Sequence, residues 1–226
     1  MMLVDGEPLL KFQVDRIKLS KKIDKIIIAT SKLPIDDEIK LFCNSYGIEC
    51  YRGSEVDVLD RYFEAAKFFN ANLIVRITAD CPLIDPKVID RLVKLHESSM
   101  ADYSSNTVPP DTSTWPDGSD VEVFTYKALE IAHKNTTDAS EREHVTFYFW
   151  KNKKNNFKLE QLSNSDNWSK YRFTVDYLED FEVVKFLISE LKRKRVFGHI
   201  NEIVDILKEN PRVVEINSKY HFGIGW

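Results

Sequence analysis

Residues 73–86 read LIVRITADCPLIDP, an apolar run that ends at the carboxylate of Asp80 and leads into a helix. In open α/β sheets, ligands bind just outside the carboxyl ends of the strands, so this position allows Asp80 to reach a metal ion or a phosphate. Residues 172–180, RFTVDYLED, repeat the pattern about a hundred residues later and place Asp176 in the same way. Two such carboxylates are able to share one magnesium ion.

Strand-like and helix-like segments alternate over about the first hundred residues. Asp85 and Pro86 have the residue types of an N-cap and a first helical position, and Gly47 suits a helix C-cap. Ser54 begins a capping-box pattern that ends at Asp57. The alternation implies βαβ crossovers and predicts an α/β fold with a mainly parallel central sheet flanked by helices. The expected helices cover residues 8–19, 34–46, 54–69 and 86–97, and the expected strands cover 25–30, 48–51 and 73–77.

In the second half of the chain, strand-like and helix-like segments no longer alternate regularly. Residues 106–119 are rich in Pro, Ser, Thr and Asp and read as a long loop, within a hairpin or loop elaboration over about 104–124. Loops longer than about 12 residues inside a compact domain are usually functional or mobile. Ser140 begins a second capping box, which predicts a helix that continues to Trp150. Further expected elements are strands over 121–124, 157–162 and 171–175, a solvated turn over 151–156, and helices over 178–191 and 200–208.

Composition and charge narrow the class of protein. With 226 residues, 43% of them hydrophobic, the chain is large enough for a full core, and we expect a single domain over 1–226. The net charge of −4 argues against a nucleic-acid partner. Cys43, Cys50 and Cys81 show no paired metal-ligand spacing and predict reduced thiols in a cytoplasmic protein. No apolar run approaches the roughly 20 residues that span a bilayer, so no membrane partner is expected.

Several sequence blocks together resemble one enzyme family. They are RGSEVDVLDRY (52–62), TADCPLIDP (78–86), DVEVF (120–124), REHVT (142–146) and the block around Asp176, with GEPL (6–9) near the start. In this order they resemble the cytidylyltransferases that activate acidic sugars, the superfamily of CMP-Kdo synthetase and acylneuraminate cytidylyltransferase. Within that superfamily, the chain is most similar to the branch of spore coat polysaccharide biosynthesis protein F. The blocks cover most of the chain, which makes a chance similarity improbable.

The resemblance implies a Rossmann-like fold of the nucleotide-diphospho-sugar transferase type. It implies a magnesium-dependent reaction that transfers CMP from CTP to a sugar acid or a related hydroxyl acceptor and releases pyrophosphate, in surface polysaccharide biosynthesis. It also implies a homodimer, for which the aromatic residues 147–150 or the loop before Val121 would supply contacts.

One feature of the family has no counterpart in the sequence. In the family, a strand and a Gly/Arg/Lys-rich loop that holds the triphosphate precede the segment that resembles residues 6–9, so we expect this nucleotidyltransferase-like domain to be N-terminally incomplete. A later start, a truncation or a different mode of CTP binding would each account for this. The alternative function is a non-catalytic sugar- or partner-binding protein of the same fold. A glycosyltransferase fits less well, since no Asp-x-Asp pair stands at a strand end.

The resemblance also implies roles for single residues. Asp80 and Asp176 match the family's metal-binding positions. Arg76 is a catalytic candidate, because a guanidinium in an apolar strand is costly to bury unless it meets a carboxylate or a phosphate. Arg172 stands four residues before Asp176 and would balance the charge of the metal site. The substrate-binding candidates are Ala29, Thr30, Ser31, Arg52, Gly53, Arg61, Glu122, Arg142, His144 and Arg172.

Simpler structural roles compete with these assignments. A structural ion pair and a substrate contact suit Arg76 equally well, and Arg61 either pairs with Asp57 or leans into the nucleotide pocket. Glu122 is either a solvent-facing strand residue or part of the acceptor pocket. His144 is either a packed polar residue of a helix or a substrate contact.

Overall fold

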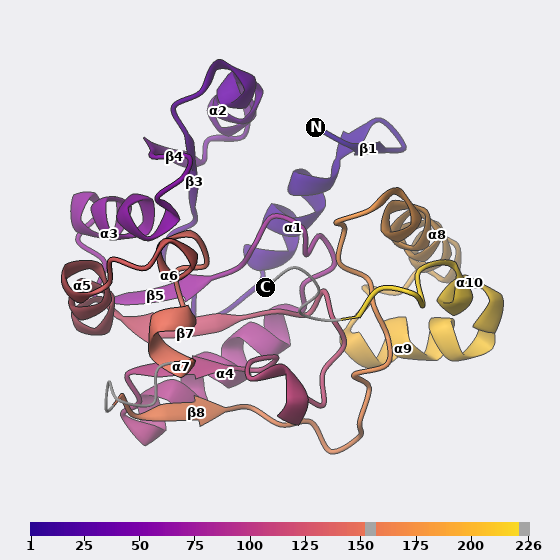
Figure 1. Cartoon of the computed structure of the whole chain (residues 1–226). Coiled ribbons are helices and arrows are strands. Elements are labelled where there is room, and N and C mark those ends of the chain that lie inside the picture. Colours follow the sequence, from indigo (N-terminus) through magenta and orange to yellow (C-terminus); the bar gives the residue numbers. More distant parts are fainter. Residues whose placement is uncertain (152–156, 222–226) are drawn as a thin grey trace.

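The computed structural model describes residues 1–151 and 157–221 of the chain. Its centre is a four-stranded sheet made, in spatial order, of β5 (Leu73–Arg76), β7 (Glu122–Thr125), β6 (Tyr103–Ser105) and β8 (Leu159–Gln161) (Figure 1). The N-terminal part contributes a hairpin, β1 (Leu3–Val4) and β2 (Glu7–Pro8), and a separate two-stranded sheet, β3 (Ile27–Ser31) and β4 (Glu49–Gly53). Among the described residues, β3 pairs only with β4 and β5 pairs only with β7.

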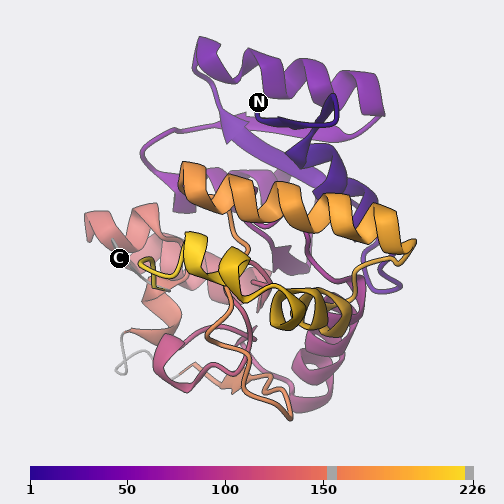
Figure 2. The same ribbon diagram turned by 90° about the vertical axis from the view of Figure 1, so that its right-hand side faces the viewer.

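Helices cover both faces of the central sheet (Figure 1). One face carries the side chains of Val121 and Val123, which share a core cluster with α4, α8 and α9; the other carries Tyr103 and Phe124, which pack with α3, α5 and α7. Figure 2 shows α8, α9 and α10 along one side of the molecule. The helices are α1 (Leu9–Ile17), α2 (Asp37–Tyr46), α3 (Val58–Phe68), α4 (Pro86–Ser99), α5 (Tyr126–Asn135), α6 (Ala139–Glu143), α7 (Phe147–Trp150), α8 (Leu178–Lys194), α9 (Ile200–Glu209) and α10 (Pro211–Ile216), with short 3₁₀ turns η1 (Pro34–Asp36) and η2 (Pro110–Thr112). No described helix combines the length and the apolar character needed to cross a bilayer.

The α/β class is confirmed, but the central sheet is mixed where a mainly parallel sheet was expected. β3 and β4 run parallel, as the early alternation of strands and helices predicts. After the long loop over 106–119, however, β7 enters between β5 and β6 and is antiparallel to both. The prediction was wrong here because the first hundred residues contain no signal for a later strand that inserts between two earlier ones.

Two helix ends follow the sequence prediction. Asp85 caps α4 by accepting a hydrogen bond from the backbone N–H of Lys87 at 2.9 Å, and Pro86 occupies the first helical position. Asp85 also accepts from the backbone N–H of Ile200 at 2.9 Å, which ties α9 to the start of α4. Gly47 ends α2 with a φ of 63°, the left-handed conformation that glycine adopts without steric cost.

Of two other helices, α3 starts later and α6 starts earlier than the capping boxes predict. Asp57 is the N-cap of α3, because its side chain accepts from the backbone N–H of the third helical residue, while the Ser54 hydroxyl accepts from the N–H of Asp57. Asp138 caps α6 in place of Ser140, by the same kind of contact. In both cases a nearby aspartate competes successfully for the cap, since Asp and Ser are about equally good N-caps.

The helix expected over 140–150 is broken into α6 and α7. Val145, a β-branched residue, has a φ of 55° and lies between the two helices. The turn directs Phe147, Tyr148 and Phe149 into the protein, where all three are buried. The expectation that residues 147–150 supply dimer contacts was therefore wrong for these three, and the homodimer stays a prediction with the loop before Val121 as its candidate surface.

The segment over 171–175 is not a strand. It forms one isolated parallel bridge, between Arg172 and Asp117, which docks it against the end of the long loop. Gly118 lies at this junction with a φ of 102°, and a Cβ atom there would be 2.4 Å from the backbone N of Thr174 and 2.6 Å from the carbonyl carbon of Phe173.

Two further outcomes concern the turn and the last helix. The turn expected over 151–156 falls outside the described residues except for Lys151. The helix α10 was missed by the sequence prediction.

We predict that Gly118→Ala lowers the free energy of unfolding by at least about 2 kcal/mol, because the added methyl group meets backbone atoms that cannot move independently. The matched control is Gly47→Ala, which also has a positive φ but has no other atom within 4 Å of the added Cβ. Gly47→Ala should lower the free energy of unfolding by only about 1 kcal/mol. Urea denaturation of the two variants and the wild type measures the difference, and equal losses would contradict the close packing at Gly118.

Candidate active site

The ends of several strands surround one pocket of about 430 Å³. The pocket lies where β5 and β6 end and β7 begins, which is the same edge of the sheet because β7 is antiparallel to both. The segment after Arg172 closes another side of the pocket. The lining residues are Arg76, Thr78, Asp80, Thr107, Val108, Asp117, Asp120, Glu122, His144, Thr146, Phe147, Trp150, Arg172, Asp176, Tyr177, Tyr220 and His221.

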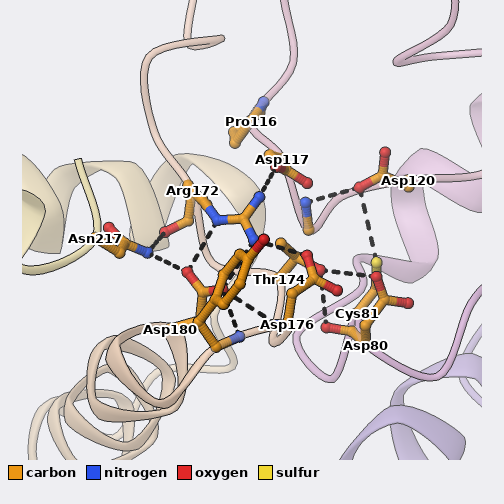
Figure 3. Close-up of polar contacts among 12 residues, drawn as sticks. Asp80, Cys81, Pro116, Asp117, Asp120, Arg172, Thr174, Asp176, Asp180 and Asn217 are labelled. Carbon is orange, nitrogen blue, oxygen red and sulfur yellow. Dashed lines mark hydrogen bonds and ion pairs between the residues drawn. The ribbon is translucent and has the colours of Figure 1, made fainter. Parts of the chain in front are cut away.

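The two carboxylates predicted to bind metal both line this pocket. The side chain of Asp80 accepts a hydrogen bond from the Thr174 hydroxyl at 2.9 Å, and its backbone carbonyl accepts from the N–H of Val175 at 2.9 Å. These contacts dock the residues just before Asp176 onto the loop that follows β5 (Figure 3). Two parts of the chain almost a hundred residues apart thus present their carboxylates to one cavity.

Arg172 holds the second of these carboxylates in place. Its guanidinium donates to Asp176 at 2.7 Å and to both oxygens of Asp180, at 2.9 and 2.8 Å, and it also forms an ion pair with Asp117 (Figure 3). Asp180 is fully buried and additionally accepts from the side-chain amide of Asn217 at 2.8 Å. The predicted proximity of Arg172 and Asp176 is present in the structure, and Asp180 and Asn217 are its supports.

Asp180 was missed as a support for the site, although a local signal exists. It occupies the third position of α8, where its carboxylate accepts from the backbone N–H groups of Asp176 and Tyr177 at 3.1 Å each. This is capping-box geometry, which a sequence pattern suggests, but its second role as an Arg172 partner depends on tertiary contacts. Although burial opposes ionisation, the hydrogen bonds from Arg172 and Asn217 lower the pKa of Asp180.

Two further carboxylates that were not predicted as site residues face the same pocket. Burial, with repulsion from Asp120, raises the pKa of Asp117 to about 8. Burial also raises the pKa of Asp120 to about 6, although Asp120 accepts a hydrogen bond from the backbone N–H of Gly118 at 2.7 Å. The sequence signal for both is the short turn DGSD over 117–120 before a strand, which is also an ordinary turn sequence.

Arg76 and Glu122 form an ion pair at the end of the central sheet. They stand opposite each other in β5 and β7, and the second oxygen of Glu122 accepts from the Tyr103 hydroxyl at 2.6 Å. Of the alternatives for Arg76, the structure therefore shows an ion pair in the pocket wall. Glu122 is only 5% exposed, so the solvent-facing alternative was wrong.

His144 lines the pocket next to the positive-φ residue Val145. Its ring stacks on Phe147 with a centroid distance of 4.3 Å. Burial lowers the pKa of His144, so its imidazole is neutral at physiological pH and offers one donor and one acceptor nitrogen.

Five of the predicted substrate-binding residues, all in the β3–β4 part of the chain, do not line the pocket. Ala29, Thr30 and Ser31 belong to β3, and Gly53 ends β4. In this part of the chain the Thr30 hydroxyl donates to Asp36 at 2.8 Å, and Arg52 donates to the backbone carbonyl of Ser31 at 2.8 Å. Arg52 also pairs with Asp37. The structure therefore places these candidates in a second polar cluster, on the β3–β4 sheet.

Arg61 and Arg142 also lie outside the pocket. Arg61 donates to the backbone carbonyl of Ser54 at 2.7 Å, so among the described residues neither alternative for it, a pairing with Asp57 or a place in the pocket, is present. Asp57 pairs with Arg142 instead, at 2.7 Å, which joins the start of α3 to α6. Tertiary contact with α6 thus replaces the local pairing of residues four apart on one helix.

The donor set of the pocket suits Mg²⁺. Among residues 1–151 and 157–221, no three His, Cys, Asp or Glu side chains form a metal cage. Magnesium, however, is usually bound through one or two carboxylates together with substrate phosphates and water. Asp80 and Asp176 supply two such carboxylates beside Asp117 and Asp120, and this surplus of negative charge favours a divalent cation.

We predict that Asp120→Asn makes the protein more stable above about pH 6. Since the pKa of Asp120 rises on folding from 3.8 to about 6, the folded state binds more protons between these values, and the free energy of unfolding falls as the pH rises through that window. Asparagine cannot titrate, so the variant should lose this fall and gain up to about 3 kcal/mol at neutral pH. Urea denaturation between about pH 4 and pH 8 measures the free energy of unfolding, with Asp205→Asn, at an exposed aspartate, as the control. If the free energy of unfolding of Asp120→Asn depends on pH as steeply as that of the wild type, the prediction is wrong.

Comparison with known sequences identifies the family of the chain. A model of the family described as cytidylyltransferase matches residues 1–215. An uncharacterised protein of Methanocaldococcus jannaschii is 39% identical over 216 residues, which are 93% of this chain and 84% of the relative. Spore coat polysaccharide biosynthesis protein SpsF of Bacillus subtilis is 29% identical over 210 residues, which are 90% of this chain and 84% of that protein.

Solved structures share the fold. A cytidylyltransferase from Leptospira borgpetersenii serovar Hardjo-bovis is 32% identical, with a TM-score of 0.86 over 97% of this chain and 91% of that chain. CMP:2-keto-3-deoxy-manno-octonic acid synthetase in complex with CTP has a TM-score of 0.60 at 12% identity, over 84% of this chain and 90% of that chain, which shows the fold alone. By its sequence over residues 1–215 and by its α/β nucleotidyltransferase fold, the chain belongs to the cytidylyltransferase family.

Proposed function

We propose that this protein transfers CMP from CTP to a hydroxyl group of a sugar acceptor and releases pyrophosphate, in the synthesis of a surface polysaccharide precursor. The observation that carries the proposal is the docking of residues 174–175 onto Asp80, which brings Asp176 to the same pocket. The cytidylyltransferase family supports CTP as the nucleotide. The name of the Bacillus subtilis relative supports the polysaccharide context.

The reaction requires positioning and charge neutralisation. The acceptor oxygen forms a bond to the α-phosphorus of CTP, the hydroxyl proton is released, and the bond between the α-phosphorus and the bridging oxygen breaks as pyrophosphate leaves. Asp80 and Asp176 would hold Mg²⁺, which would neutralise charge on the phosphate oxygens when bound. Arg172 orients the Asp176 carboxylate through their ion pair at 2.7 Å. Orientation of this kind supplies much of the rate in phosphoryl-transfer chemistry.

The second candidate function is a non-catalytic sugar- or partner-binding protein of the same fold. One observation favours it: the predicted substrate-binding residues Thr30, Ser31 and Arg52 hydrogen-bond within their own cluster and do not line the pocket. A protein of this kind would bind an acceptor sugar without releasing pyrophosphate.

We predict that Asp80→Asn and Asp176→Asn each reduce pyrophosphate release from CTP and Mg²⁺ by about a hundredfold or more, because each removes charge from the metal site. The measurement is a coupled pyrophosphate assay over a panel of sugar acceptors, with thermal unfolding to show that the variants fold. Asp24→Asn, at an exposed aspartate far from the pocket residues in sequence, is the control and should keep full activity.

Full turnover in both variants would rule out the metal role of these carboxylates. If the wild type binds a sugar of the panel in calorimetry but neither binds CTP with Mg²⁺ nor releases pyrophosphate, the non-catalytic function replaces the proposed one.

A further inference from the structure

We infer that one wall of the pocket, formed by Arg76, Thr107 and Glu122 and here called the hydroxyl wall, binds two adjacent hydroxyl groups of the acceptor and excludes a carboxylate from that position. The inference rests on the proposed function, since it names the chemistry by which the acceptor is recognised. It concerns the part of the acceptor that does not react.

Strand pairing places Arg76 and Glu122 side by side, and the bend after β6 brings Thr107 to the same pocket. Arg76 is paired with Glu122 across β5 and β7, and Ser105, the last residue of β6, is paired with Glu122 on the other side. Thr107 lies in the bend that follows β6, two residues beyond Ser105, and so comes to the same edge of the sheet as Glu122. All three residues of the wall line the pocket.

The hydroxyl wall has hydrogen-bonding capacity that the protein leaves unused. Among residues 1–151 and 157–221, the buried Arg76 Nε atom has no hydrogen-bond partner. Thr107 is only 1% exposed, and its hydroxyl lies beside Asp120 but forms no hydrogen bond of ordinary geometry within the described part of the chain. Glu122 accepts one hydrogen bond on each oxygen, whereas a carboxylate has about four acceptor positions. Because buried polar groups without partners are unfavourable, a ligand that supplies the missing partners is stabilised here.

The charges of the hydroxyl wall select the kind of ligand. Arg76 is already neutralised by Glu122, and Asp120, which lies beside Thr107, adds negative charge to the same pocket. A ligand carboxylate at the wall would meet the repulsion of Glu122 and Asp120, and a ligand ammonium would meet that of Arg76. A hydroxyl group avoids both, because it accepts from the Arg76 Nε–H and donates to Glu122 at the same time.

A pair of adjacent hydroxyls fits the wall better than one. One hydroxyl satisfies Arg76 and Glu122, and its neighbour satisfies the Thr107 hydroxyl, which both donates and accepts. Adjacent hydroxyls are the common feature of neutral sugar rings and of the polyol tails of sugar acids, so any carboxylate of the acceptor must lie away from this wall.

The test pairs variants of the wall with analogues of the acceptor. The wild type is first assayed for pyrophosphate release with CTP and Mg²⁺ against neutral hexoses, hexuronic acids, 2-aminohexoses and keto-sugar acids of eight and nine carbons. Monodeoxy analogues of the accepted sugar are then compared in the wild type, in Thr107→Val and in the control Thr137→Val, an exposed threonine that does not line the pocket. Calorimetric binding of the sugar provides a readout that does not depend on turnover.

We expect Thr107→Val to raise the acceptor KM and its dissociation constant by about tenfold, which corresponds to one hydrogen bond, while the KM for CTP changes less than about twofold. One monodeoxy analogue should bind the wild type about tenfold more weakly and should lose nothing more in Thr107→Val, because both changes remove the same contact. Thr137→Val should match the wild type.

The inference would be overturned if, for every monodeoxy analogue, the loss of affinity caused by the missing hydroxyl and the loss caused by Thr107→Val simply added together. It would also be overturned if the required acceptor group at this wall were a carboxylate, shown by a sugar acid whose binding tightens in Glu122→Gln and is lost when that acid is reduced to an alcohol. If CTP and Mg²⁺ bind but no acceptor of the panel gives pyrophosphate, the inference fails and the nucleotide half of the proposed function survives. If CTP and Mg²⁺ do not bind, the proposed function itself fails.

Discussion

The ion-pair network of Arg172 joins the parts of the chain on which the pocket depends. Its guanidinium contacts Asp117 at the end of the long loop, Asp176 in the following segment and the buried Asp180 at the start of α8. Asn217, beyond α10, donates to Asp180 and to the Arg172 carbonyl, so the C-terminal part is tied to the same point. A guanidinium suits such a junction because its donors are planar and fixed. Removing one partner of a buried pair leaves an uncompensated charge, at a cost of about 3–5 kcal/mol.

The same network makes the pocket acidic. Three carboxylates satisfy one arginine, while Asp80 and Asp120 lie nearby, so the pocket has more negative than positive charge. Burial raises the pKa values of Asp117 and Asp120; repulsion from Asp120 adds to the rise at Asp117, and repulsion from Asp80 adds to the rise at Asp120. A divalent cation with its bound phosphates would relieve that repulsion. In the hydroxyl wall, by contrast, Arg76 and Glu122 balance each other, so in the proposed function this wall would form the acceptor side of the pocket, opposite a metal and phosphate side at Asp80 and Asp176.

The direction of β7 explains why these two sides meet. Because β7 runs antiparallel to β5 and β6, its first residue, Glu122, lies at the sheet edge where β5 and β6 end. The loop before it delivers Asp117 and Asp120 to that edge, and the close contact of Gly118 with Phe173 and Thr174 holds the loop against the Asp176 segment. The β3–β4 sheet is not paired with the central sheet among the described residues, and its polar cluster of Thr30, Ser31 and Arg52 is correspondingly separate from the pocket.

The amino-acid sequence alone determined the features that depend on near neighbours. The cap formed by Asp85 and Pro86, the left-handed Gly47 and the strand that ends before Asp80 are set by contacts within a few residues, and they could be predicted. Only the tertiary structure decided that Glu122 is buried against Arg76, that Asp57 pairs with Arg142, and that β7 inserts between β5 and β6. Those outcomes depend on residues tens of positions apart, whose pairing is selected by burial and charge in the assembled core. Local sequence patterns carry no information about which distant residue forms the pair.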